Sequence, residues 1–93
     1  MVKVHLKGYI VVPAEDYEVV KAELPNHIRL TRAEAGCESF SVEPSASDPH
    51  RFNVAETFVS KPAFEAHQAR VQASRWGEVT QNVERFYEIS EEE

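Results

Sequence analysis

The chain has 93 residues, of which 42% are hydrophobic and 28% are charged, as is typical of one small globular domain. A chain of this size holds a small core and leaves little room for a large enclosed cavity, so we expect that pairing with a second copy would help it. The formal net charge of −6 argues against nucleic acid and anionic membranes as partners, because both are bound through basic patches.

Cys37 is the only cysteine, which excludes an intrachain disulfide and a Cys-x-x-Cys metal site. The first twelve residues, MVKVHLKGYIVV, are too short and too often interrupted by lysine and histidine for a signal peptide or a membrane span. We therefore expect a cytoplasmic protein. The last three residues, 91–93, are all glutamate and are expected to form a frayed, solvated end of the single domain 1–93.

Residues 2–12 alternate between an apolar and a mixed face, which is the period of a β-strand. Gly8 interrupts the apolar face and indicates a bulge or the close approach of another group. The apolar face carries Val2, Val4, Leu6, Ile10 and Val12, and the mixed face carries Lys3, His5, Lys7, Tyr9 and Val11.

Residues 14–24 are predicted to form a helix, because Pro13 ends the strand and the acids Glu15 and Asp16 suit the positive end of the helix dipole. Pro25 is expected to break or kink this helix, since proline lacks the backbone N–H that the helix needs. The predicted buried stripe consists of Tyr17, Val20 and Leu24.

A second helical piece is predicted over residues 26–34, with Gly36 as a suitable stop. This piece carries Ile28, Leu30 and Thr31. His27 and Arg29 are expected to face solvent or the rim of the core.

Two further strands follow, over residues 37–44 and 51–59, and a short polar loop at 45–50 joins them as a hairpin. In the first of these strands, Phe40 and Val42 are in phase. In the second, one face is expected to carry Phe52, Val54, Glu56 and Phe58, and the other Asn53, Ala55, Thr57 and Val59.

A helix is predicted over residues 62–73, because Ser60 is a good N-cap and Pro62 suits the first helical turn. Phe64, His67 and Val71 recur at helical spacing, so they should share the face that points to the core.

Residues 74–81 are predicted to form a second helical turn or two that carries Trp76, and residues 82–90 a fourth strand with Val83, Arg85, Tyr87 and Ile89 on one face. The order β-α-β-β-α-β describes a ferredoxin-like fold, an α+β architecture in which helices cover one face of an antiparallel sheet.

His67 and Glu56 are the candidate catalytic pair, because both are expected to point into the same apolar interior. The carboxylate would hold one tautomer of the imidazole and raise its pKa, and the imidazole would relay a proton at neutral pH. The alternative is a buried hydrogen bond that only satisfies two polar groups. No metal is expected, since the four histidines do not share ligand spacing.

Two further side chains have open interpretations. Trp76 is either a core residue or one wall of a pocket. Arg70 lies one helical turn from His67, where it either borders a pocket mouth or pairs at the surface with Glu56, Glu65 or Glu78.

Three stretches resemble the antibiotic biosynthesis monooxygenase family, in particular its quinol monooxygenase-like members: LTRAEAGCESFSV, RFNVAETFVSKPAFEAHQAR and SRWGEV. The shared features are a helix ending in TRAE-x-GC, the strand-borne Glu56, the aromatic Phe58, the Ala63-Phe64-x-x-His67 run and Ser74-x-Trp76. The resemblance extends over residues 2–89.

The resemblance implies a dimer in which two such domains pair sheet to sheet into an α/β barrel. It also implies oxidation of quinols or related electron-rich aromatics by molecular oxygen, without flavin, haem or metal. His67, oriented by Glu56, would then be the base, and the substrate ring would lie among Trp76, Phe64 and Phe52. Arg70 and Asn53 are further expected contacts, although Asn53 falls on the opposite strand face.

Other members of this family have other activities. Haem-degrading relatives use an Asn, a His on the second helix and a Trp, and other relatives isomerise small phosphorylated molecules. A small-molecule-binding dimer without turnover is the competing class. A ligand-sized cleft bordered by both Glu56 and His67 would favour an enzyme.

Overall fold

The computed structural model describes residues 2–93 and confirms the predicted order of elements. A short 3-10 turn, Ala14–Asp16, precedes the first helix. The elements are β1 (Lys3–Val11), α1 (Tyr17–Arg32), β2 (Cys37–Pro44), β3 (Arg51–Phe58), α2 (Lys61–Gln72), α3 (Arg75–Val79) and β4 (Glu84–Glu92).

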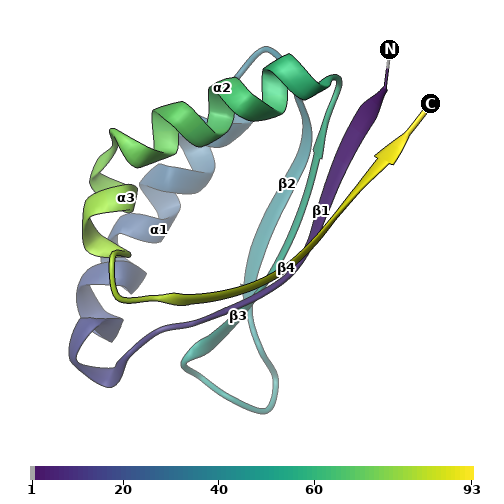
Figure 1. Ribbon diagram of the computed structural model, residues 1–93. Coiled ribbons are helices and arrows are strands. Elements are labelled where there is room, and N and C mark those ends of the chain that lie inside the picture. Colours follow the sequence, from purple (N-terminus) through teal and green to yellow (C-terminus); the bar gives the residue numbers. More distant parts are fainter. Residues whose placement is uncertain (1) are drawn as a thin grey trace.

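The four strands form one sheet in the order β2-β3-β1-β4, and every neighbouring pair is antiparallel. The three helices lie together on one face of this sheet (Figure 1). This is the predicted ferredoxin-like α+β fold.

Strand alternation places the core as the sequence predicts. The inward face of β3 carries Phe52, Val54, Glu56 and Phe58, and all four side chains are buried. From β1, the buried side chains are Val4, Leu6 and Ile10, followed by Val12 just after the strand. One carboxylate therefore stands in an otherwise apolar row, directly under the helices.

The acidic end of the chain differs from the prediction. Glu91 and Glu92 belong to β4 and pair with Val4 and Lys3 of β1, so only Glu93 lies beyond the strand. Lys61 also contacts the Glu91 carboxylate at 3.2 Å. Backbone pairing with β1 and the Lys61 ammonium group thus hold two residues that were expected to fray. The negative charge of residues 91–93 could not predict whether their backbone pairs with another strand.

Pro25 does not end the first helix. α1 runs from Tyr17 to Arg32 through this proline, whose side chain is exposed. Proline removes one hydrogen bond, to a carbonyl four residues earlier, and packing of the rest of the helix on the sheet holds the two halves in one element.

Gly8 marks a close approach, as its position suggested. A Cβ atom at this residue would collide with the backbone carbonyl of Phe86 on β4. Glycine therefore lets β4 lie tightly against β1. Within residues 2–93, no helix is long and apolar enough to cross a membrane.

Candidate functional site

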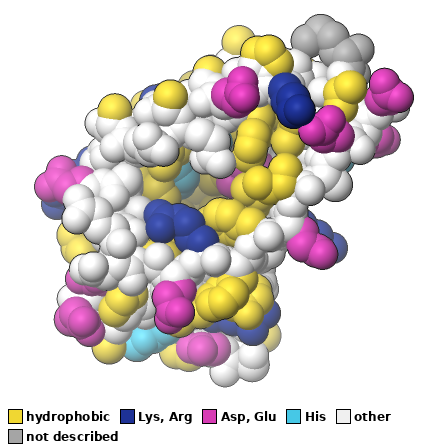
Figure 2. All heavy atoms as spheres, in the orientation of Figure 1, with side chains coloured by type: hydrophobic (Ala, Val, Ile, Leu, Met, Phe, Trp, Pro, Cys, Tyr) yellow, Lys and Arg dark blue, Asp and Glu magenta, His cyan; other side chains and the backbone are white. Residues whose placement is uncertain are grey.

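A cleft of about 590 Å³ opens between α2, α3 and the inner face of β4. In Figure 2 this side of the molecule is hollowed, with a histidine side chain inside the hollow and basic atoms at its edge. Its lining mixes polar and apolar side chains and is made of Leu6, His27, Glu56, His67, Gln68, Val71, Gln72, Trp76, Gly77, Thr80, Gln81, Arg85 and Tyr87.

His67 lies on the inward face of α2 and is 3% exposed. The helix begins where the sequence predicts: the Ser60 hydroxyl accepts a hydrogen bond from the Ala63 backbone N–H, and Pro62 stands in the first turn. The start of α2 thereby sets the phase that turns the imidazole toward the sheet.

The imidazole is held by Glu34, which was not predicted. Nδ1 of His67 lies 3.0 Å from Oε1 of Glu34, and the other carboxylate oxygen accepts a hydrogen bond from Nε of Arg70. A carboxylate only accepts hydrogen bonds, so Nδ1 carries the proton and Nε2 keeps its lone pair. The expectation that Glu56 fixes the tautomer is therefore wrong; Glu34, in the turn after α1, makes that contact.

Glu56 approaches the other ring nitrogen without forming a hydrogen bond. Its Oε1 lies 3.8 Å from Nε2 of His67 and has no hydrogen-bond partner among the described residues. Burial, with a smaller contribution from the charge of Glu34, raises the pKa of Glu56 to about 7. Near neutral pH this carboxyl group exchanges a proton readily, beside an imidazole that accepts one.

Opposing influences act on the pKa of His67. Burial lowers it, while the hydrogen bond and negative charge of Glu34 act in the opposite direction; the net shift is downward. The ring is therefore predominantly neutral at pH 7, the form that a general base requires.

His27 is the main residue that sequence reasoning placed wrongly. It is 4% exposed and its ring stacks on the indole of Trp76, with centroids 4.5 Å apart and planes 6° from parallel. Burial, followed by the nearby charges of His67, Arg70 and Arg85, lowers its pKa to about 3. Its Nδ1 has no hydrogen-bond partner among the described residues.

Trp76 fits both of its interpretations, because its side chain is 7% exposed and belongs to the hydrophobic core but also lines the cleft. It lies on α3, whose start is capped by the Ser74 hydroxyl accepting from the Gly77 backbone N–H. Thr80, at the other end of α3, donates its hydroxyl to the Trp76 carbonyl at 2.6 Å. A short helix closed at both ends thus holds the indole against His27.

The remaining expected contacts lie elsewhere. Phe64 packs on Phe58 in the core, and Phe52 borders a different groove. Asn53 points to the outer face of the sheet, as its alternation required. Arg70 donates to Glu34 and Thr31 and borders a shallow depression on the other side of His67. None of the four lines the cleft.

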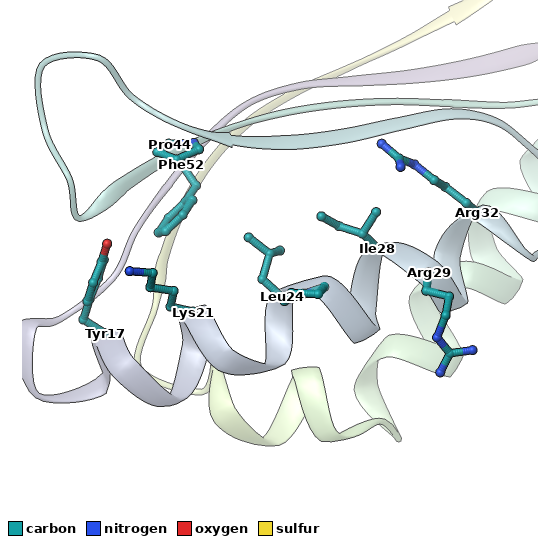
Figure 3. A pocket seen from close by; sticks show the side chains of 9 residues that line it. Tyr17, Lys21, Leu24, Ile28, Arg29, Arg32, Pro44 and Phe52 are labelled. Atoms are coloured by element: carbon teal, nitrogen blue, oxygen red, sulfur yellow. The ribbon is translucent and has the colours of Figure 1, made fainter.

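A larger groove of about 750 Å³ runs between α1 and the hairpin of β2 and β3. In Figure 3, Leu24, Ile28 and Phe52 point into it, and Arg29 points away. No histidine, aspartate or glutamate lines it. The groove is therefore a poorer candidate for proton-transfer chemistry than the smaller cleft.

Within residues 2–93, no group of three or more His, Cys, Asp or Glu side chains is arranged to hold a metal ion.

Comparisons with known proteins agree with this architecture. Residues 1–79 match the family model described as antibiotic biosynthesis monooxygenase. A Pseudomonas aeruginosa structure superposes with a TM-score of 0.78 at 23% identity, over 98% of this chain and 92% of that one. A structure described as an antibiotic biosynthesis monooxygenase has a TM-score of 0.76 at 18% identity, over 100% and 97%.

A conserved protein from Methanosarcina mazei has the same TM-score of 0.76 at 15% identity, over 100% of this chain and 95% of that one. At these identities the structures show a common fold. The comparison with curated proteins gives no match.

Proposed function

Because this chain belongs to the antibiotic biosynthesis monooxygenase family, we propose that it oxidises a phenolic or quinol-type aromatic substrate with molecular oxygen. His67 is the general base in this proposal, and the chemistry uses the substrate's own electrons without a bound cofactor. The observation that carries it is the buried imidazole that lines the cleft, with Nδ1 fixed by Glu34 and Nε2 on the side of Glu56.

The proposed reaction starts with proton transfer. Nε2 of His67 takes the proton of an aromatic hydroxyl, and the resulting phenolate is electron-rich enough to pass electrons to oxygen. For a phenol, one atom of the oxygen molecule is added to a ring carbon, and the product is a quinone. The other oxygen atom is released as water, which takes up the hydroxyl hydrogen and the hydrogen of that ring carbon. The proton on Nε2 goes to this reduced oxygen, which returns His67 to its neutral form.

The two carboxyl groups have different parts in this scheme. Glu34 holds the Nδ1–H and stabilises the imidazolium when it forms. Glu56, with its raised pKa, lies beside Nε2 and exchanges protons with the reacting groups near neutral pH. The stacked rings of Trp76 and His27 both line the cleft and supply its aromatic surface toward a substrate ring.

The cleft favours this reaction over the alternatives. A binding protein without turnover needs no imidazole beside a carboxyl group of raised pKa, yet both border one ligand-sized cleft. Haem degradation in the relatives named above uses an asparagine, and no asparagine lines the cleft. Isomerisation of a phosphorylated molecule has no specific observation in its favour.

The test is oxygen consumption by the purified protein with a panel of hydroquinones and dihydroxynaphthalenes. We expect uptake above autoxidation with the unmodified protein and its loss in His67→Ala. The matched control is His50→Ala, which removes a histidine that stacks on Tyr17 outside the cleft. Equal uptake in the His67→Ala and unmodified proteins would contradict the mechanism.

We also propose that the protein is a homodimer that pairs through the outer face of the sheet. On that face Tyr9 stacks on Phe86 at 4.8 Å, Arg51 lies over the Tyr9 ring, and Phe86 is 45% exposed. Light scattering on the unmodified protein and on Phe86→Glu tests this pairing. We expect the unmodified protein to be a dimer and the variant to be a monomer.

We also propose that the protein is cytoplasmic. Its single cysteine fits the reducing conditions of that compartment.

A further inference from the structure

Arg85 is fixed in place by neutral groups. It lies on β4 and lines the cleft together with Tyr87, two residues along the same strand face. Its Nη2 donates to the Thr80 hydroxyl at 2.8 Å, and its Nη1 donates to the Val83 carbonyl at 3.3 Å. Thr80 is fully buried and also donates to the Trp76 carbonyl, so the guanidinium group is tied to the aromatic wall of the cleft.

The charge of Arg85 is not matched by a nearby carboxylate. In residues 2–93, no carboxylate lies within 4.0 Å of the Arg85 guanidinium. The same holds for five other basic residues, and the remaining four pair with glutamates. What distinguishes Arg85 is its place: among residues 2–93 it is the only lysine or arginine that lines the cleft.

Apart from the Glu56 carboxyl group beside His67, the polar lining of the cleft is rich in neutral hydrogen-bonding groups. Gln68 and Gln72 from α2 and Gln81 from the turn after α3 join Arg85 and Tyr87 in the lining. Amide side chains can donate to an anion without adding charge. Together with a guanidinium group, which presents a planar fork of N–H donors, they form a suitable environment for a carboxylate.

We propose that Arg85 binds an anionic substituent of the substrate, so that the substrate class is a hydroxylated aromatic carboxylate. The phenolic hydroxyl would face His67 while the carboxylate lies at Arg85. The part that concerns the hydroxyl rests on the proposed function, and the part that concerns the carboxylate rests only on the unmatched guanidinium group and its neutral surroundings.

The test compares two ligands that differ by one carboxylate: 1,4-dihydroxybenzene and 2,5-dihydroxybenzoate. Trp76 is the only tryptophan and lines the cleft, so quenching of its fluorescence reports binding. Titration under argon prevents turnover. We expect the benzoate to bind about tenfold more tightly, as one charge-assisted hydrogen-bonded contact allows, and the preference to fall with added salt.

Three variants separate recognition from folding. Arg85→Gln should abolish the preference for the benzoate. Its affinity for 1,4-dihydroxybenzene should stay within about twofold of that of the unmodified protein, which is a small change compared with the tenfold preference. Arg85→Lys should restore part of the preference. Arg75→Gln, which removes an exposed arginine on α3 that pairs with Glu78, should leave both affinities unchanged. Circular dichroism checks that each variant is folded.

The outcomes distinguish this inference from the proposed function. Equal binding of both ligands to the unmodified protein would overturn it, as would a preference that survives in Arg85→Gln. Weaker binding of both ligands in folded Arg85→Gln, by equal factors, would also overturn it. A carboxylate preference that needs Arg85, without oxygen uptake that needs His67, would support this inference and contradict the monooxygenase proposal.

Discussion

The two histidines at the centre of the helical layer, His27 on α1 and His67 on α2, are almost equally buried but have different surroundings. His27 lies flat on Trp76 with Nδ1 unpaired, and its pKa falls to about 3. His67 has a carboxylate at Nδ1, which opposes the effect of burial on its pKa. The hydrogen-bond partner of a buried imidazole, more than its burial, therefore decides whether the imidazole can act as a base.

The strongest test of this contrast is to replace each histidine with phenylalanine. We expect His67→Phe to lower the rate of oxygen consumption by about 10²- to 10⁴-fold, the range for loss of a general base, because no other group takes its place at Nε2. His27→Phe keeps an aromatic ring beside Trp76 and should retain most of the rate. Equal losses in the two variants would break the distinction.

The acid stability of the protein should depend on His27. Its pKa is about 3 in the folded protein and near 6.5 in the unfolded chain, so the unfolded state binds the additional proton. Stability that is present above pH 6.5 is therefore lost as the pH falls toward 3, by about 3 kcal/mol between pH 7 and pH 4. Urea denaturation at these two pH values should show a much smaller loss in His27→Phe.

Glu56 should have the opposite pH dependence. Its pKa is raised from 4.5 in the unfolded chain to about 7 in the folded protein, so its contribution to stability is present below pH 4.5 and lost as the pH rises through 7. We expect Glu56→Gln to gain about 2–3 kcal/mol over the unmodified protein between pH 4.5 and pH 7. Thermal unfolding across this range measures the difference, and a gain that does not change with pH would show that the carboxyl is not perturbed.

The smallest expected effect concerns the partner of His67. Glu34→Gln keeps an oxygen that can accept the Nδ1–H but removes the charge, so we expect the oxygen consumption rate to fall about tenfold, with little change in KM. The pKa of His67, followed by ¹⁵N NMR, should also fall, because Glu34 raises it. Since Glu34 also raises the pKa of Glu56, the Glu56 carboxyl should titrate at a lower pH in this variant.

Regular periodicity explains which parts of the site could be predicted. Glu56 and His67 follow from the two-residue repeat of β3 and the turn spacing of α2, and Arg85 from the alternation of β4. His27 lies seven residues after Val20 and three after Leu24, on the same buried stripe. The prediction of two separate helical pieces did not relate His27 to this stripe, whereas one helix through Pro25 places it there.

Glu34 could not be found in this way. It lies in a turn, where side-chain direction follows no repeat, and its contact with His67 joins residues 33 positions apart. The distance between Glu56 and His67 was equally inaccessible, because it depends on how far α2 lies above the sheet. Periodicity determines which face a residue occupies, and packing between elements determines which neighbour it meets.

The sequence of β4 has a consequence for how the protein behaves at high concentration. β4 is an edge strand, and an unpaired edge is a template on which another chain can add a strand. Four of its nine residues are glutamates, at positions 84, 88, 91 and 92. A second copy that approached this edge with its own β4 would bring four more negative charges, so self-addition of strands is opposed at neutral pH. Acidification would remove this protection and favour aggregation through the same edge.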